Sequence, residues 1–179
     1  MAAINFFLGF FCLVVINDPG GTFGHLVSAN YSGDGYAKVV AAAQKEIGVR
    51  EGSIPNAGKR VSEYLRYTGI KTPDKWCAAW VSYVFGKAGY SVPKTAWSPA
   101  LFPASRLVKN AKPGIVLGIY YSSLKRIAHC GIVEEVKNDW IFSVEGNTNI
   151  DGSREGDGVY RRRRHIRTIH RFADWIARP

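Results

Sequence analysis

Residues 127–147 read IAHCGIVEEVKNDWIFSVEGN, and this stretch decides the fold. Two segments rich in β-branched and aromatic residues, 127–136 and 140–145, flank the turn-forming residues Lys137-Asn138-Asp139. That combination is typical of a hairpin of two antiparallel strands. Similar strand-like segments occupy residues 115–121 and 159–167. The second half of the chain therefore predicts a sheet built from consecutive antiparallel strands.

The first half of the chain has helical patterns instead. Residues 34–47 form an Ala-rich segment with Asp34 as a candidate N-cap and Gly48 as a terminator. Further helices are expected at residues 58–67 and 76–88, and the proline-rich region that follows predicts loops with short helical turns. Helices first and strands second favour an α+β fold, with the helices packed on one face of the sheet.

Length and composition favour one domain. The chain has 179 residues, of which 46% are hydrophobic, and this is enough for one ordinary core. The uncharged apolar run at residues 4–16 is shorter than the roughly 20 residues that a membrane-spanning helix needs. It suits a secretory signal that is cleaved after Ala29, leaving residues 30–179 as a secreted or cell-envelope domain with no stable membrane span. Because no Lys or Arg precedes the run, a retained anchor and a buried N-terminal segment stay open as alternatives.

The charge balance is strongly basic. The formal net charge is +10, and every Lys and Arg lies after residue 30. Such a chain is attracted to anionic partners, either nucleic acid or anionic polymers of the cell envelope. No helix-turn-helix, zinc-finger or RNA-recognition signature is present, so nucleic acid is not expected. The densest basic run is Arg161 to Arg164, which fits a strand that alternates between solvent and a neighbour, with aliphatic stems covering apolar surface.

Cys77 is the candidate nucleophile. It lies at the expected start of the third helix, where unpaired backbone N–H groups and the helix dipole favour a thiolate. Its own N–H is also a candidate donor to an oxyanion. Two alternatives remain on local grounds: a buried structural cysteine, or a disulfide with Cys130.

His129 is the candidate base. It is a polar ring in the middle of an apolar strand, and strand alternation places it and Cys130 on opposite faces. If His129 faces Cys77, we expect Cys130 to point away, which disfavours a disulfide between the two cysteines. A lone histidine in a strand is also compatible with an ordinary hydrogen-bonded core residue.

Glu145 is the candidate third member. A turn on Lys137-Asn138-Asp139 that sets Val136 opposite Trp140 also sets His129 opposite Asn147. Glu145 is then the diagonal neighbour of His129, at a Cα separation of about 7 Å that a glutamate side chain spans. In this position it fixes the tautomer of the imidazole. A two-residue turn shifts the register by one residue and moves Glu145 to the other face.

Three segments in order resemble the CHAP domain family, the cysteine, histidine-dependent amidohydrolases/peptidases of the papain-like superfamily. They are WCAAWVSYV at 76–84, AHCGIV at 128–133 and EGN at 145–147. The resemblance implies a papain-like CHAP fold with the following site. Cys77 is the nucleophile, His129 the base and acid, Glu145 the orienting group and Asn147 a fourth polar member; Trp76, Trp80 and Gly131 are assigned to substrate contact. The family's P-G-D-[IV] segment reads Pro113-Gly114-Ile115-Val116 here, so its Asp is missing.

The resemblance also implies a reaction. It is hydrolysis of a peptidoglycan amide, at the muramoyl–L-alanine bond or within the peptides, through a thioester and with no cofactor or metal. No metal-binding spacing such as CxxC or HExxH is present. We expect a monomer whose partner is peptidoglycan or another anionic envelope polymer. The alternatives are an amidase for another amide such as a polyamine conjugate, a basic nucleic-acid-binding module, and an inactive wall-binding domain.

Overall fold

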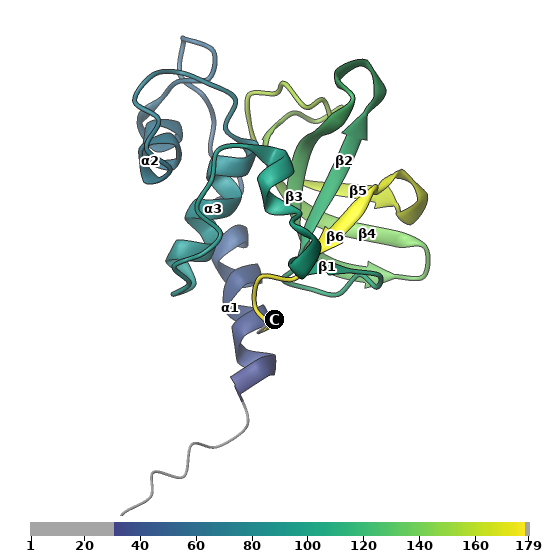
Figure 1. Cartoon of the computed structure of the whole chain (residues 1–179). Coiled ribbons are helices and arrows are strands. Elements are labelled where there is room, and N and C mark those ends of the chain that lie inside the picture. Colours follow the sequence, from purple (N-terminus) through teal and green to yellow (C-terminus); the bar gives the residue numbers. More distant parts are fainter. Residues whose placement is uncertain (1–30, 178–179) are drawn as a thin grey trace, which may run out of the picture.

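The computed structural model describes residues 31–177, so the proposed signal segment at residues 1–29 lies outside the described residues. The α+β expectation is confirmed, with helices first and an antiparallel sheet second (Figure 1). Among the described residues, no helix is both long and apolar enough to cross a bilayer. The helices and strands are α1 (Tyr31–Gln44), α2 (Lys59–Tyr67), α3 (Cys77–Lys87), β1 (Leu107–Val108), β2 (Val116–Tyr121), β3 (Arg126–Lys137), β4 (Trp140–Thr148), β5 (Gly158–His165) and β6 (Arg171–Ala173).

The strands form one sheet in the order β1-β6-β2-β3-β4-β5, and every neighbouring pair is antiparallel. The three helices lie to one side of this sheet in Figure 1, with α3 next to β3. The three internal strands β2 to β4 and the edge strand β5 occupy the segments predicted from sequence. The short strands β1 and β6 were not predicted, because two or three residues are too few to show an alternating pattern.

The helix boundaries differ slightly from the prediction. α1 begins at Tyr31, so Asp34 lies in its first turn rather than at the N-cap, where it pairs with Lys38 at 2.6 Å. An acidic side chain in the first turn is favourable because it faces the positive end of the helix dipole. α3 begins at Cys77, with Trp76 as its N-cap residue.

The main core lies between α3 and the sheet. Residues 77–85 of α3 are all buried, and their partners include Val116, Ile132 and Val144 from three neighbouring strands. Such a helix is apolar on nearly all sides because α1 and α2 cover the face that the sheet does not. The second cluster covers the opposite face of the sheet and is formed by Ile115, Leu117, Val133, Ile141 and Phe172.

The β3–β4 hairpin departs from the predicted turn and still reaches the predicted register near the site. Its turn has two residues, with Asn138 at a φ of 52°, and Lys137 pairs with Trp140, so the expected pairing of Val136 with Trp140 is wrong. A bulge between Val133 and Glu135 then adds one residue to β3. Beyond this bulge Val133 pairs with Ser143 and Ile132 with Val144, which is the register that the prediction required for these residues.

Candidate active site

Cys77 occupies the N-terminus of α3, as predicted, and is only 4% exposed. The helix start is held against β4, because the backbone N–H of Trp76 donates to Oδ1 of Asn147 at 3.2 Å. The N–H groups of a first helical turn have no intrahelical acceptor and point at the residue that begins the helix. The sulfur therefore lies in a region of positive backbone potential.

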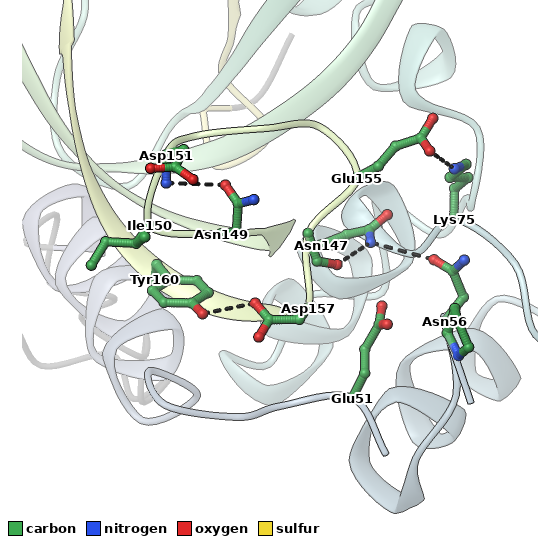
Figure 2. A pocket seen from close by; sticks show the side chains of 12 residues that line it. Glu51, Asn56, Lys75, Asn147, Asn149, Ile150, Asp151, Glu155, Asp157 and Tyr160 are labelled. Atoms are coloured by element: carbon green, nitrogen blue, oxygen red, sulfur yellow. Dashed lines mark hydrogen bonds and ion pairs between the residues drawn. The ribbon is translucent and has the colours of Figure 1, made fainter. Parts of the chain in front are cut away.

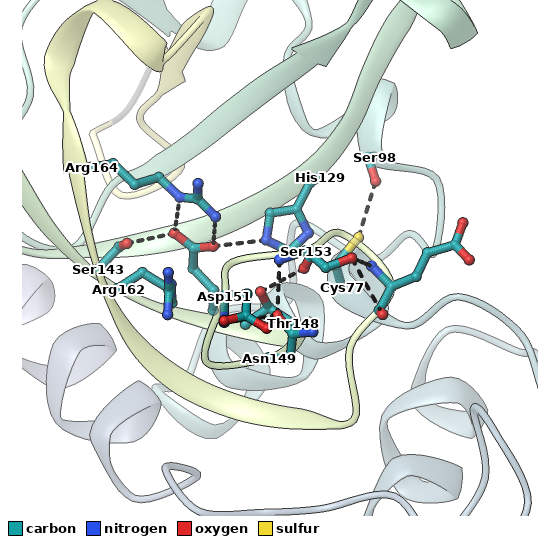
Figure 3. A network of polar contacts seen from close by, with 12 residues as sticks. Cys77, Ser98, His129, Ser143, Thr148, Asn149, Asp151, Ser153, Arg162 and Arg164 are labelled. Atoms are coloured by element: carbon teal, nitrogen blue, oxygen red, sulfur yellow. Dashed lines mark hydrogen bonds and ion pairs between the residues drawn. The ribbon is translucent and has the colours of Figure 1, made fainter.

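His129 lies on β3 and is fully buried. Its Nε2 atom is 2.8 Å from Oε2 of Glu145. The other ring nitrogen, Nδ1, is buried without a hydrogen-bond partner among the described residues, and in Figure 3 it points toward the sulfur of Cys77. The structure thus brings together the thiol, the imidazole and the carboxylate that the sequence pattern selected.

Glu145 is the centre of a buried network. Ser143 donates from Oγ to its Oε1 atom at 2.6 Å. Arg164 donates from Nε to Oε1 and from Nη2 to Oε2, each at 2.6 Å. Burial raises the pKa of the Glu145 carboxyl, but Arg164 and His129 outweigh that effect and hold the pKa far below its ordinary value. Glu145 is therefore an anion that two cationic groups and one hydroxyl fix in place.

The surroundings of the site lower the pKa of the Cys77 thiol and raise the pKa of the His129 imidazole. Interaction with the Cys130 thiol is the largest cause that lowers the pKa of Cys77, and it outweighs burial together with His129 and Ser98. Burial lowers the pKa of His129, but Cys77 and Glu145 outweigh burial and raise it to about 9. At neutral pH the favoured state is a thiolate beside an imidazolium, which is the reactive form of a cysteine nucleophile.

Ser98 is a site residue that the sequence analysis missed. It begins the short 3₁₀ turn Ser98–Leu101, is 4% exposed, and places its Oγ atom 3.4 Å from the sulfur of Cys77. The hydroxyl is one of the groups that lower the pKa of the thiol. A serine in a proline-rich loop 21 residues from the nucleophile carries no local pattern that predicts this contact.

Arg164 is a second site residue that the sequence analysis missed, although that analysis identified the basic run Arg161 to Arg164. The run alternates as predicted, with Arg161 and Arg163 exposed and Arg162 and Arg164 half-buried. Arg164 contacts Glu145, whereas Arg161 forms an ion pair with Glu134 on β3. Two of the four charges are thus already neutralised within the protein, which weakens the idea of a nucleic-acid-binding patch.

Cys130 does not point away from the nucleophile, so that expectation is wrong. It belongs to the same buried cluster as Cys77, and its thiol interacts with the Cys77 thiol. Both cysteines are free, so the disulfide alternative is not formed. Strict alternation fails to predict this arrangement because β3 also carries a register shift beside His129, between the pairs Ile119–His129 and Tyr120–Ile127. Bulges of this kind redirect neighbouring side chains.

Asn147 is close to the site in sequence but has a different role from the expected one. Its side chain accepts from the N–H of Trp76 and donates to the carbonyl of Gly156 at 3.0 Å and to Asn56. It holds the start of α3 to the loop after β4 and makes no hydrogen bond with His129. Its φ of 56° is the left-handed conformation that asparagine tolerates better than most residues.

The three residues assigned to substrate contact are buried structural residues. Trp76 and Trp80 are fully buried, and Trp76 stacks on Tyr64 and donates from Nε1 to Glu51 at 2.7 Å. Gly131 does not leave room for a substrate. A Cβ atom there would lie 2.5 Å from Cγ of Glu145, so the space above this glycine is filled by the carboxylate that orients His129.

Two cavities adjoin the site. A small one of about 130 Å³ lies directly over the sulfur and is lined by Asp74, Lys75, Cys77, Ala96, Trp97, Ser98, Arg126, Ala128 and Arg154. A larger, polar one of about 480 Å³ is lined by Asn147 together with Glu51, Asp151, Glu155 and Asp157 (Figure 2). Lys75 lines both cavities. Within residues 31–177, no group of three or more His, Cys, Asp or Glu side chains is arranged to hold a metal ion.

Comparison with known proteins gives weak similarity. No family model matches the chain, and no curated protein matches it. Solved structures that match include Ly7917 "with the hydrolyzing product of MDP" at a TM-score of 0.45 and Ly7917 without it at 0.44, each 14% identical. The matches cover 76% of this chain and 61% and 60% of theirs, so the chain spans about three-fifths of those structures' length.

Proposed function

We propose that the chain is a cysteine-dependent hydrolase of amide bonds in peptidoglycan peptides, either an N-acetylmuramoyl-L-alanine amidase or an endopeptidase. The observation that carries the proposal is the position of His129 between Cys77 and Glu145. Its Nε2 atom bonds the carboxylate of Glu145, and its Nδ1 atom faces the sulfur of Cys77. A nucleophile, a base and an orienting group in hydrogen-bonding sequence constitute the general logic of a catalytic triad. The resemblance to CHAP domains in the same residues supports the same reaction class.

In the proposed mechanism, the thiolate of Cys77 attacks the amide carbonyl carbon, and a carbon–sulfur bond forms as the carbonyl π electrons move to oxygen. We assign the backbone N–H of Cys77 and the hydroxyl of Ser98, whose Oγ lies 3.4 Å from the sulfur, as the donors to that oxyanion. His129 then gives its proton to the departing nitrogen, the carbon–nitrogen bond breaks, and an amine leaves behind a thioester. His129, now neutral, takes a proton from water as the water oxygen bonds to the thioester carbon. The carbon–sulfur bond then breaks, which releases the carboxylic acid and regenerates the Cys77 thiolate beside protonated His129.

The choice of peptidoglycan as substrate rests on charge and on the expected export. A net charge of +10 attracts an anionic wall polymer, and the apolar segment at residues 4–16 is proposed to direct the chain to the cell envelope. An amidase that acts on a polyamine conjugate is disfavoured on the same ground, because a polycationic substrate is repelled by a basic protein.

The test is incubation of purified peptidoglycan with the wild-type chain and with Cys77→Ala, followed by mass spectrometry of newly released amines. We expect the wild type to release amines and Cys77→Ala to release none. Lys137→Gln, in the exposed β3–β4 hairpin, is the matched control and should retain full release. Equal release by the wild type and Cys77→Ala would contradict the proposal. The identity of the new amino terminus distinguishes an amidase from an endopeptidase.

A further inference from the structure

Positively charged side chains outnumber negatively charged ones around the small cavity over Cys77. Three cationic side chains line it: Lys75, Arg126 and Arg154. Lys75 and Arg154 share one carboxylate, Glu155, which is 2.7 Å from Nζ of Lys75 and also pairs with Arg154. Arg126 forms no ion pair with any carboxylate of the described residues 31–177.

Arg126 is held in position by neutral contacts instead. Its guanidinium lies 4.2 Å from the centroid of the Trp97 ring, and Nη1 donates to the carbonyl of Ile127 at 3.1 Å. Stacking on an aromatic face orients a guanidinium and leaves its outer edge free for a ligand. A planar fork of N–H donors matches the two oxygens of a carboxylate better than it matches a single neutral carbonyl.

The size of the cavity limits what can enter it. At about 130 Å³ this cavity is much smaller than the polar cavity of about 480 Å³, so it suits a compact group such as a carboxylate on a short side chain. The same cavity is lined by Cys77 and Ser98, so a group bound there lies next to the reacting carbonyl. Lys75, Arg126 and Arg154 carry three positive charges, against which stand the two carboxylates of Glu155 and Asp74. One positive charge is left over, so a monoanion suits this space better than a dianion.

We propose that Arg126, stacked on Trp97, forms a subsite for a free carboxylate next to the scissile amide. The inference rests on the proposed function and makes it more specific, because it selects peptides that carry a side-chain or α-carboxylate at that position. A substrate with a carboxamide in the same place loses one charge-assisted contact with the guanidinium. Conversion of that carboxylate to an amide would therefore protect a peptide from cleavage.

The first test uses two synthetic muropeptides that differ only in a carboxylate or a carboxamide beside the scissile amide. With the wild type we expect kcat/KM to favour the carboxylate by at least about tenfold. With Arg126→Gln this ratio should fall to near one, and with Arg126→Lys, which keeps the charge but not the fork, it should be intermediate. Arg163→Gln on the exposed face of β5 is the matched control and should keep the wild-type ratio. A wild-type ratio near one, or an unchanged ratio in Arg126→Gln, would overturn the subsite.

The second test separates the subsite from the catalytic proposal. Binding of the same two peptides to Cys77→Ala is measured by calorimetry, with and without Arg126→Gln. We expect at least about tenfold tighter binding of the carboxylate peptide, lost in the double variant. Equal affinities for both peptides would overturn the subsite even if both are cleaved. A carboxylate preference in binding without any Cys77-dependent cleavage would instead support the subsite and contradict the hydrolase proposal.

Discussion

Arg164 donates from Nε and Nη2 to the two carboxylate oxygens of Glu145, each at 2.6 Å, while one of those oxygens also lies 2.8 Å from Nε2 of His129. One buried carboxylate thus connects a guanidinium on β5 to the imidazole on β3. The guanidinium group of Arg164 donates to both carboxylate oxygens and therefore restricts rotation of the Glu145 carboxylate. The orientation of the carboxylate relative to the imidazole ring of His129 is fixed as a result. Arg164 acts through Glu145 and is therefore a positioning residue.

Replacing Arg164 with Met should destabilise the fold strongly. The change leaves Glu145 buried with two hydrogen bonds fewer, and loss of one partner of a buried pair costs about 3–5 kcal/mol. Urea unfolding measures the difference in the free energy of unfolding. Arg163→Met is the matched control on the same strand. It removes a guanidinium that stacks at 4.5 Å on the exposed Trp140, and should cost about 1 kcal/mol or less. Equal costs for the two variants would contradict the special role of the Glu145 pair.

The reactivity of Cys77 should be nearly independent of pH around neutrality. Its thiol pKa lies well below the ordinary value, so alkylation by iodoacetamide should proceed at pH 6, where an ordinary thiol with a pKa of about 8.5 is almost fully protonated. In His129→Ala the midpoint of the alkylation profile should move toward that ordinary value. Burial raises the pKa of Cys130, so this thiol serves as an unreactive internal control in the mass spectrum. A wild-type midpoint near 8.5 would refute the ion pair.

The rate of hydrolysis should be highest around neutral pH and should decrease at both lower and higher pH. Below the Cys77 pKa the thiolate is protonated and cannot attack. As pH rises through about 9, His129 loses the proton that the leaving amine needs, so amine release should decline there. Amine release from peptidoglycan, measured from pH 5 to 10, checks the expectation. A rate that keeps rising through pH 10 would be incompatible with an imidazolium as the acid.

Gly131→Ala should disturb the site without removing any functional group. The added methyl would lie 2.5 Å from Cγ and 3.3 Å from Cδ of Glu145, and that side chain is held by three partners and cannot move aside freely. Overpacking of this kind costs about 1–3 kcal/mol and should lower kcat by misaligning the carboxylate. Gly33→Ala on α1 has open space around the new methyl and should leave kcat unchanged. If both variants behave alike in thermal unfolding and turnover, Gly131 has no special role.

Asn147→Gly tests whether Asn147 matters for its left-handed backbone conformation or for the hydrogen bond that its side chain accepts from Trp76. Glycine tolerates the φ of 56° but cannot accept from the N–H of Trp76, so the start of α3 loses its anchor. We expect a loss of stability of about 1–2 kcal/mol and a lower rate of Cys77 alkylation. Asn147→Asp, which keeps the acceptor, should retain more of the alkylation rate. Full stability in the glycine variant would show that the conformation alone matters.

The periodicity of the chain determined much of this protein without tertiary information. The enrichment of β2 to β5 in β-branched and aromatic residues and the helical pattern of α1 to α3 are local properties, and they predict these elements to within a few residues. The same local reasoning selected Cys77 and His129, because a cysteine at a helix start and a polar ring in an apolar strand are visible in a short window of sequence.

Only the tertiary structure decided how these residues meet. The predicted turn was wrong, and the bulge at Glu134 restored the register that lets Glu145 reach His129. Bulges, strand twist and the burial of Trp76 and Trp80 depend on packing between segments far apart in the chain, and a local pattern carries no record of such packing. Ser98 and Arg164 lie 21 and 19 residues from their partners, Cys77 and Glu145, and join the site only because the folded chain brings distant loops and strands together.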